Sequence, residues 1–195
     1  IVFAMGQAGM VSRILAKKLG TVVTFACISD DDATAPGQIP IKEFKNIYRS
    51  DIIDCNTELY GVIADPVEHS MSPAIHNAGF ADVGFNKLYL PLLVEGDYDE
   101  FEMFMDNVLR RSWLGFKGFS VTLPHKENAL EYIKEKGGVV EPLAEKIGAV
   151  NTIVLGPDNK LFGYNTDYAG AIEAIASKIG GREKLQRMNV AVIGA

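Results

Sequence analysis

The spacing of apolar and polar positions changes several times along the 195-residue chain and predicts its elements. Residues 59–64, 87–94 and 115–123 are short apolar or alternating runs, which predict buried strands. Residues 97–111 and 127–136 instead repeat their apolar side chains every three or four positions, which predicts amphipathic helices. Strands that alternate with helices in this way are typical of an α/β fold, and we expect a mostly parallel sheet.

The third of these runs ends abruptly. Phe119, Val121 and Leu123 alternate with polar residues, so they predict one apolar strand face. Pro124 has no N–H for a sheet ladder, and the chain must therefore leave the sheet there. Lys126 follows at a turn from strand to helix, where α/β proteins often place ligand-binding side chains. A cation at a helix N-terminus opposes the helix dipole, so helix stability does not explain Lys126. Taken alone, Lys126 could still be a solvated surface lysine.

The first fifty residues form a separate, smaller unit. Their pattern predicts a strand, a helix, a second strand, a polar loop and a last helix, over residues 1–4, 11–19, 21–28, 29–40 and 41–48. This order fits the end of a parallel α/β unit, but so few elements cannot bury a stable core alone. We therefore expect four parts: 1–50, a polar linker at 51–58, an ordered body at 59–187, and an apolar strand that begins a further domain at 188–195.

Short polar motifs follow successive predicted strands of the body. They contribute Ser70, Ser72, Thr122, Lys126, Asn151 and Asp167. The ends of strands in an open α/β sheet line one crevice, so we expect these side chains to meet there. Ser72 fits the N-cap and Pro73 the first helical position of the next helix, and such a helix start predicts a carboxylate site. The alternative is that Ser72 and Asp167 only cap their helices. A carboxylate grip, a lysine and an aspartate suit proton-coupled reduction of a small hydroxy acid.

Composition excludes several classes of partner. A net charge of −6, a pI near 5.1 and no basic run argue against nucleic acid. No apolar run approaches the roughly 20 residues that a membrane span needs. Cys27, Cys55 and the three histidines lack metal-ligand spacing, so we expect no metal and a reducing compartment. The chain starts at Ile1 and stops in an apolar run, and we expect it to be a piece of a longer polypeptide.

Four motifs in order identify a resemblance for residues 59–195. They are His-Ser-Met-Ser-Pro at 69–73, Ser-Val-Thr-Leu-Pro-His-Lys at 120–126, Gly-Ala-Val-Asn-Thr at 148–152 and Tyr-Asn-Thr-Asp at 164–167. This stretch resembles shikimate dehydrogenase, which reduces 3-dehydroshikimate to shikimate with NADP. The resemblance implies that Ser70 and Ser72 bind the shikimate carboxylate. It further implies that Thr122, Asn151 and Asp167 bind ring hydroxyls, that Lys126 and Asp167 form the catalytic pair, and that Gly194 begins the cofactor-binding turn of a Rossmann domain.

The first segment resembles the C-terminus of type I 3-dehydroquinate dehydratase, a TIM barrel. The motifs are Met5-Gly6, Val-Ser-Arg at 11–13 and Thr-Ala-Pro-Gly-Gln at 34–38. The resemblance implies that Arg13 and Gln38 contact the dehydratase substrate, and that the Schiff-base lysine and its histidine lie upstream. From its residues alone, Arg13 could equally be a helix-surface arginine.

The whole chain resembles the plant-type bifunctional enzyme, in which a dehydratase barrel precedes an open α/β substrate-binding domain. This implies a chloroplast location, otherwise the cytoplasm, and we expect a monomer. We expect residues 1–195 alone to bind shikimate poorly and NADP hardly at all. Two alternatives stay open. A quinate dehydrogenase is disfavoured by Ser70 and Thr122, and a non-catalytic shikimate-binding module is disfavoured by the Lys126–Asp167 pair.

Overall fold

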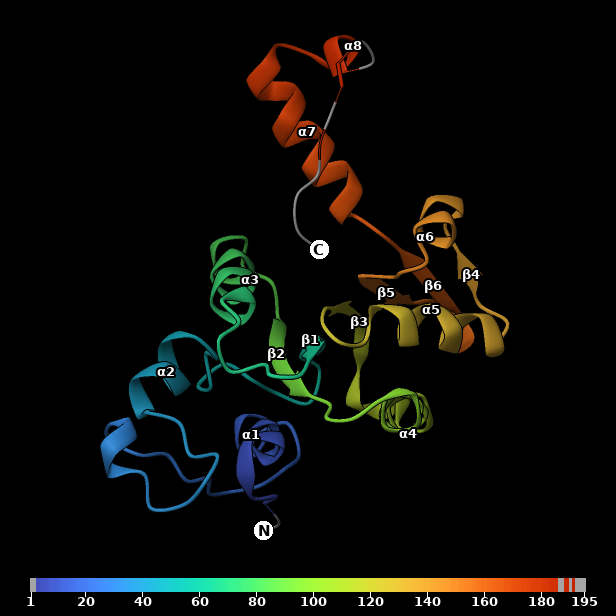
Figure 1. The fold of residues 1–195 in the computed structure, drawn as a ribbon. Helices are drawn as coiled ribbons and strands as arrows, with labels where there is room; N and C mark the ends of the chain where they lie inside the picture. Colours follow the sequence, from blue (N-terminus) through green and yellow to red (C-terminus); the bar gives the residue numbers. More distant parts are fainter. Residues whose placement is uncertain (1–2, 186–187, 190, 192–195) are drawn as a thin grey trace.

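A computed structural model describes residues 3–185, 188, 189 and 191 and has one six-stranded sheet at its centre (Figure 1). The strand order is β2-β1-β3-β5-β6-β4. The strands are β1 (Glu58–Ala64), β2 (Lys87–Leu93), β3 (Phe116–Val121), β4 (Val139–Val140), β5 (Thr152–Leu155) and β6 (Leu161–Tyr164). The predicted α/β class is confirmed.

The sheet is mixed in direction. β1 is parallel to both β2 and β3, and β4 is parallel to β6, whereas β5 is antiparallel to β3 and β6. β5 and β6 form a hairpin, and Gly-Pro-Asp-Asn at 156–159, a sequence typical of a turn, connects them. Because β5 runs against β3, the residue before β5 lies at the same sheet edge as the residue after β3. Asn151 thereby comes beside the end of β3, although it precedes its strand instead of following it.

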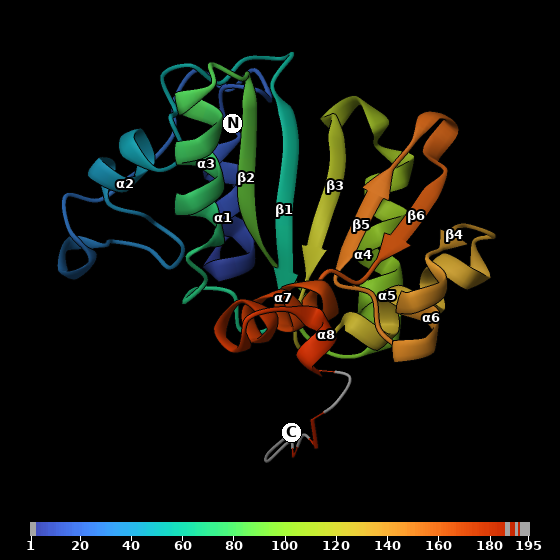
Figure 2. The same ribbon diagram turned by 90° about the horizontal axis from the view of Figure 1, so that it is seen from above.

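Helices join most of the strands and cover the sheet (Figure 2). They are α1 (Gly6–Ile14), α2 (Ile41–Asn46), α3 (Ser72–Asp82), α4 (Tyr98–Arg110), α5 (Lys126–Glu135), α6 (Pro142–Ile147), α7 (Asp167–Ile179) and α8 (Arg182–Leu185). Short 3₁₀ turns occur at 30–32, 112–114 and 157–159. α4 begins with a capping box of Asp97 and Glu100, which supplies acceptors for N–H groups that the first turn leaves unpaired.

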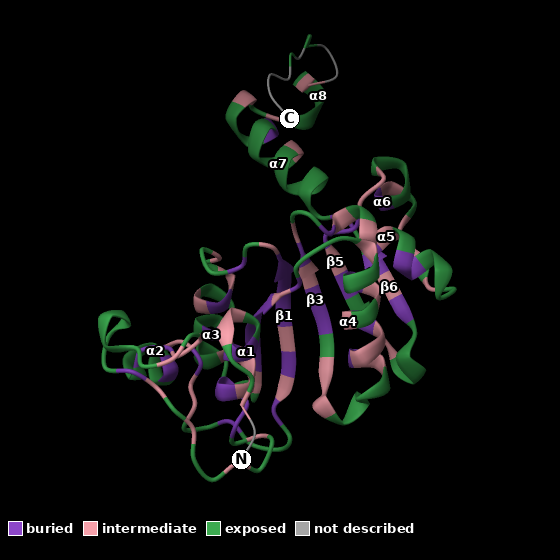
Figure 3. Ribbon diagram, turned by 60° about the horizontal axis from the view of Figure 1, so that its bottom comes forward, coloured by how far each residue is buried: buried purple, intermediate pink, exposed green. Residues whose placement is uncertain are grey.

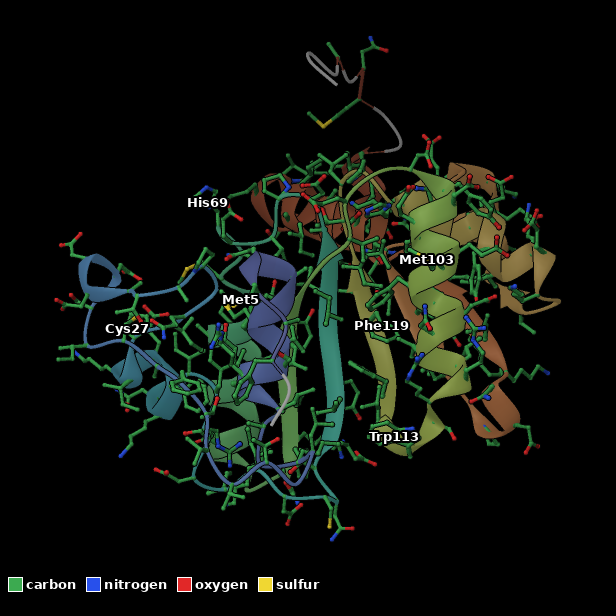
Figure 4. All side chains as sticks on the ribbon, turned by 90° about the horizontal axis from the view of Figure 1, so that it is seen from below. Met5, Cys27, His69, Met103, Trp113 and Phe119 are labelled. Atoms are coloured by element: carbon green, nitrogen blue, oxygen red, sulfur yellow. The ribbon has the colours of Figure 1, made fainter. Side chains whose placement is uncertain are left out.

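Two hydrophobic clusters lie on opposite faces of the sheet, as the alternation of side chains along a strand requires. Leu59 and Ile63 of β1 face the main cluster, which includes Phe101 of α4 and Tyr132 of α5. Val62 and Ala64 point the other way and pack with Tyr89 and Phe80, beside α3. Phe119 of β3, labelled in Figure 4, lies 6.1 Å from Phe104 of α4, measured between ring centroids. Helices α4 and α5 therefore secure β3, the strand that leads to Lys126.

The main cluster also includes the N-terminal segment. Met10, Ile14 and Leu15 of the α1 region and Phe44 of α2 are buried in it together with residues of β1 and β2. The ordered body expected at residues 59–187 therefore shares its core with the N-terminal segment. The apolar face of α1 packs on β2, which removes it from water without a barrel of its own.

Both strands expected in the first fifty residues are absent from the described structure. Phe3 and Ala4 are irregular, and residues 21–28 form only an isolated bridge from Cys27 to Pro40. Val22 and Ile28 are exposed. The physical reason is that a strand needs a neighbour for its N–H and C=O groups. No strand of the described residues runs beside this segment.

Two further expectations fail at element ends. β3 stops at Val121, and Leu123, expected on the buried face, is 74% exposed in the loop that follows. On α7, the apolar stripe of Ile172, Ile175, Ala176 and Ile179 is typical of an amphipathic helix with a buried face, but only Ala176 is buried. Figures 1 and 3 show α7 projecting from the sheet with a mostly exposed surface. The predicted strand at 188–195 lies largely outside the described residues.

Candidate active site at the carboxyl edge of the sheet

The loops that leave β1 and β3 are tied together where both strands end. The Thr122 N–H donates to the Ile63 carbonyl at 3.0 Å, and the Asp65 N–H donates to the Leu123 carbonyl at 3.1 Å. The Val121 N–H donates to the Asn151 carbonyl at 2.7 Å. These main-chain bonds bring Thr122 and Asn151 to one edge of the sheet.

Lys126 and Asp167 meet at this edge, although 41 positions separate them. Lys126 is the first residue of α5 and Asp167 the first of α7. The Lys126 Nζ lies 2.6 Å from Asp167 Oδ2, so the ion pair is also a hydrogen bond. The side chains are 29% and 56% exposed, which leaves the pair open to a small ligand. The predicted juxtaposition is therefore present.

The charge of Asp167 is stabilised by its neighbours. The hydrogen bond from Lys126 lowers the pKa of the Asp167 carboxyl most. Partial burial opposes this shift, and a hydrogen bond from Asn151 lowers the pKa further. At neutral pH the aspartate is ionised and Lys126 faces a full negative charge.

Asn151 is buried and satisfied within the site. Its Nδ2 donates to Asp167 Oδ1 at 2.8 Å and to Thr166 Oγ1 at 2.9 Å. Its Oδ1 accepts from the Thr166 N–H at 3.0 Å and from Thr152 Oγ1 at 2.9 Å. An asparagine amide has two donor hydrogens and two acceptor lone pairs, so these bonds use its capacity. A ligand hydroxyl would have to replace one of them, and the exposed Thr166 hydroxyl is the easiest to displace.

The two serines lie at the start of α3, beyond the end of β1. Ser70 Oγ accepts a hydrogen bond from the Ser72 N–H at 3.3 Å. The helix begins with Ser72 itself, its N-cap is Met71, and no side chain caps it. The expectation that Ser72 is the N-cap is therefore wrong by one position, since the chain turns into the helix at Met71. Both hydroxyls remain near free N–H groups of a helix N-terminus, which attracts anions.

Arg13 and Gln38 are not brought together. Arg13 is only 3% exposed, so it is no helix-surface arginine, and its buried Nε has no hydrogen-bond partner. It lines a cavity of about 490 Å³ beside α2. Gln38 accepts hydrogen bonds from Thr34 and lines a different cavity of about 360 Å³, which also includes Ser70.

The histidines do not gather, and no metal-binding group of three or more His, Cys, Asp or Glu side chains occurs among the described residues. His69, labelled in Figure 4, is exposed on the loop before α3. His76 stacks on Tyr89 at 4.3 Å between ring centroids. His125 is fully buried, with Nε2 2.6 Å from the Val94 carbonyl oxygen. In the part of the chain that the structure describes, no helix has the length and apolarity to cross a membrane.

The sequence did not single out Asn165, Thr166 and Glu141 as site residues. Thr166 bonds to Asn151, Asn165 accepts from the Asp167 N–H, and Glu141 accepts from the Asn165 N–H. The available signal was an asparagine two positions before Asp167, because such a side chain often binds the backbone two residues on. Gly194, the predicted cofactor-binding residue, lies outside the described residues.

Comparisons with known proteins agree with the motifs. Residues 62–153 match the family model described as shikimate dehydrogenase substrate binding domain, and residues 1–54 match type I 3-dehydroquinase. Two segments of the chain are therefore similar to two different families. The resemblance that the motifs indicated is thereby confirmed for both parts.

Three known proteins give the scale of the similarity. The bifunctional 3-dehydroquinate dehydratase/shikimate dehydrogenase of Arabidopsis thaliana, named chloroplastic, is 43% identical over 88% of this chain and 27% of its own. A shikimate dehydrogenase (NADP(+)) of Bacillus mycoides is 42% identical over 71% of this chain and 46% of its own. A crystal structure of Thermus thermophilus shikimate 5-dehydrogenase with NADP(H) and shikimate is 33% identical, with a TM-score of 0.51, over 62% and 42% of the two chains. The chain thus spans between about a quarter and a half of these relatives.

Proposed function

We propose that the full-length protein carries a shikimate dehydrogenase that reduces 3-dehydroshikimate to shikimate with NADP. The observation that carries this proposal is the Lys126–Asp167 ion pair, with its 2.6 Å contact at the carboxyl edge of the sheet. The names of the Bacillus relative and of the Thermus complex support NADP and shikimate as its ligands.

Lys126 supplies the proton in this proposal. Its ammonium can protonate the oxygen of a ketone that is being reduced. Asp167 keeps the ammonium at the edge of the sheet and assists proton exchange with solvent. In the reverse direction the pair must release a proton, so the oxidation of shikimate should become faster as the pH rises.

The substrate carboxylate would be held by Ser70 and Ser72. Their hydroxyls stand at the N-terminus of an eleven-residue helix, whose free N–H groups and dipole favour an anion. Thr122 and Asn151 at the same edge would bind ring hydroxyls. The proposal therefore assigns one end of the ring to α3 and the other to the Lys126–Asp167 pair.

NADP would accept or supply the hydride when bound. Among the described residues no glycine-rich turn from a strand to a helix is available to hold its pyrophosphate. The described residues contribute the substrate side of the reaction.

For residues 1–54 we propose a part of a type I dehydratase, in which Arg13 and Gln38 contact 3-dehydroquinate. The buried Arg13 Nε without a partner supports this, because such a group is rare unless a ligand or water satisfies it. In the full-length protein, Arg13→Lys should reduce dehydratase kcat/KM while shikimate oxidation is unchanged. Equal dehydratase activity in the variant would remove Arg13 from that site.

The test of the main proposal is a substrate panel on the full-length protein. NADP-dependent oxidation should be fast with shikimate and much slower with quinate, whose additional ring hydroxyl must be accommodated. A preference for quinate would favour the quinate dehydrogenase alternative. Binding of shikimate without turnover would favour the non-catalytic module, against which the ion pair argues.

The cellular location and the oligomeric state of the protein are also proposals. The Arabidopsis relative is named chloroplastic, which supports a chloroplast location for this protein, with the cytoplasm as the alternative. We further propose a monomer. Fractionation of the source cells and light scattering of the full-length protein test the two statements separately.

A further inference from the structure

Helix α7, which carries Asp167 in its first turn, has little packing to hold it. Of its thirteen residues only Ala176 is buried, and its main helix neighbour is α8. Figures 1 and 3 show it standing away from the sheet. Among the described residues, the contacts that place Asp167 are hydrogen bonds at the start of the helix.

Asn165 makes those bonds from a buried position. Its side chain is part of a residue that is only 6% exposed. Its Oδ1 accepts from the Asp167 N–H at 3.0 Å, and its Nδ2 donates to the Ala149 carbonyl at 2.9 Å. The Asn165 N–H in turn donates to Glu141 Oε2 at 3.3 Å. One amide thus links the first residue of α7 to the loop that contains Asn151.

Asn151 and Asn165 both link the start of α7 to the loop at 149–151, but from opposite sides. Asn151 reaches from its loop to the Thr166 N–H and the Asp167 carboxylate, while Asn165 reaches back to the Ala149 carbonyl. Of the two asparagines, only Asn151 donates to the Asp167 carboxylate and lowers its pKa directly. Asn165 touches the backbone and controls where the carboxylate is.

We propose that Asn165 is a positioning residue that sets Asp167 against Lys126. This rests on the proposed function as far as catalysis is concerned, whereas the placement of the carboxylate can be measured without turnover. Without the Asn165 amide, the first turn of α7 loses its bond to the Ala149 carbonyl and keeps only its bonds to Asn151 of the loop at 149–151. The Asp167 carboxylate then moves away from the Lys126 ammonium for part of the time.

The decisive variant is Asn165→Ala in the full-length protein. We expect kcat for shikimate oxidation to fall about 10- to 100-fold, the effect of a misplacement of about an ångström, with a smaller change in KM. The kcat of Asn165→Ser should lie between those of wild type and Asn165→Ala, because a serine hydroxyl can still accept from the Asp167 N–H but cannot reach the Ala149 carbonyl.

A readout independent of activity is the titration of the Asp167 carboxyl, followed by NMR with carbon-13-labelled aspartate and assigned with Asp167→Asn. The pKa should be below the ordinary aspartate value in the wild type and should rise in Asn165→Ala as the Lys126 contact is lost. Thr57→Val is the matched control. Thr57 is a buried polar residue that donates to Asn86 at the opposite end of β1, so its loss should lower stability alone.

The outcomes separate the two proposals. A wild type that does not oxidise shikimate contradicts the proposed function, while the titration still decides the role of Asn165. An Asp167 pKa and a kcat equal to wild type in Asn165→Ala would overturn the inference. If that variant does not fold, Asn165→Ser decides, and wild-type values for it overturn the inference in the same way.

Discussion

At the scale of single residues, the Lys126–Asp167 contact accounts for features that local structure does not explain. A lysine is unfavourable as the first residue of a helix, yet Lys126 begins α5. Its partner Asp167 suits a helix start, but its carboxylate is directed to Lys126 and Asn151, and the helix N-cap Thr166 has no capping side-chain bond. Both placements are explained if the pair handles a proton.

The first prediction concerns this pair in the full-length protein. Lys126→Ala and Asp167→Asn should each lower kcat for shikimate oxidation by about 10²–10⁴, the usual share of general acid–base catalysis. The double variant should be far from additive, because the two groups act as one unit. Lys134→Ala is the matched control, since Lys134 lies on α5 like Lys126 and forms a 2.7 Å pair with Glu145 of α6. Near wild-type turnover in Lys126→Ala would contradict the mechanism.

The second prediction separates binding from capping at the start of α3. Ser72→Ala should weaken shikimate binding by about 1–3 kcal/mol, the value of a hydrogen bond to a charged group. Its unfolding free energy should change by less than about 0.5 kcal/mol, because the Ser72 hydroxyl caps nothing. KM for shikimate and urea unfolding test the two parts. A stability loss with an unchanged KM would make Ser72 a purely structural residue.

At the scale of elements, a polar cluster joins α4 to α5. The fully buried Tyr132 donates from its hydroxyl to Asp106 Oδ1 at 2.8 Å, and the Lys136 ammonium lies 2.9 Å from the same oxygen. Lys136 also contacts Glu102 at 3.1 Å. The hydrogen bonds from Lys136 and Tyr132 lower the pKa of Asp106, in that order. Burial chiefly, together with the bond to Asp106, raises the pKa of Tyr132.

The third prediction follows from the sign of the Asp106 shift. A carboxyl whose pKa is lower in the folded state stabilises the fold above its unfolded pKa of about 3.9. That contribution disappears as the pH falls through the folded pKa. Asp106→Asn should therefore make unfolding stability fall less steeply between about pH 5 and pH 2. Urea unfolding at several pH values measures it, and parallel curves for wild type and variant would contradict it.

The fourth prediction concerns the Tyr132 hydroxyl, the buried member of this polar cluster. Tyr132→Phe removes one hydrogen bond and keeps the ring that packs on Phe101. We expect a loss of about 1 kcal/mol in the free energy of unfolding at neutral pH. Tyr168→Phe, at an exposed position of α7, is the control and should be neutral. Equal stability of the two variants would mean that the Tyr132 hydroxyl contributes nothing.

At the scale of the whole molecule, the N-terminal segment and the sheet share one core. Ile14 is 1% exposed within the main cluster, and Leu15 and Phe44 accompany it. The segment therefore stabilises the sheet domain, and a border drawn at residue 50 does not separate two cores. This follows from burial, which depends on which apolar surfaces meet and not on where a sequence family ends.

The fifth prediction measures that coupling. Ile14→Ala should lower the free energy of unfolding by about 2–5 kcal/mol, as for other buried truncations. Amides of α1 should be protected from hydrogen exchange to the same degree as those of β1. Leu19→Ala, at a 41% exposed site, is the control and should be within about 0.5 kcal/mol of wild type. Fast exchange throughout α1 would contradict a core that the N-terminal segment shares with the sheet.

The sequence by itself determined the elements whose partners lie nearby in the chain. The strands of the body, the β5–β6 hairpin and the amphipathic α4 and α5 follow from side-chain period and turn residues, which act over a few positions. The site motifs were visible for the same reason, because each is a short run of neighbouring residues.

Only the tertiary structure decided the remainder. Residues 21–28 have a strand-like sequence but no neighbour to pair with, and the stripe on α7 has little to pack against. The antiparallel direction of β5 places Asn151, and long-range bonds make Asn165 the link behind Asp167. Such outcomes depend on which distant groups meet, and burial and hydrogen bonding between distant segments leave no local pattern in the sequence.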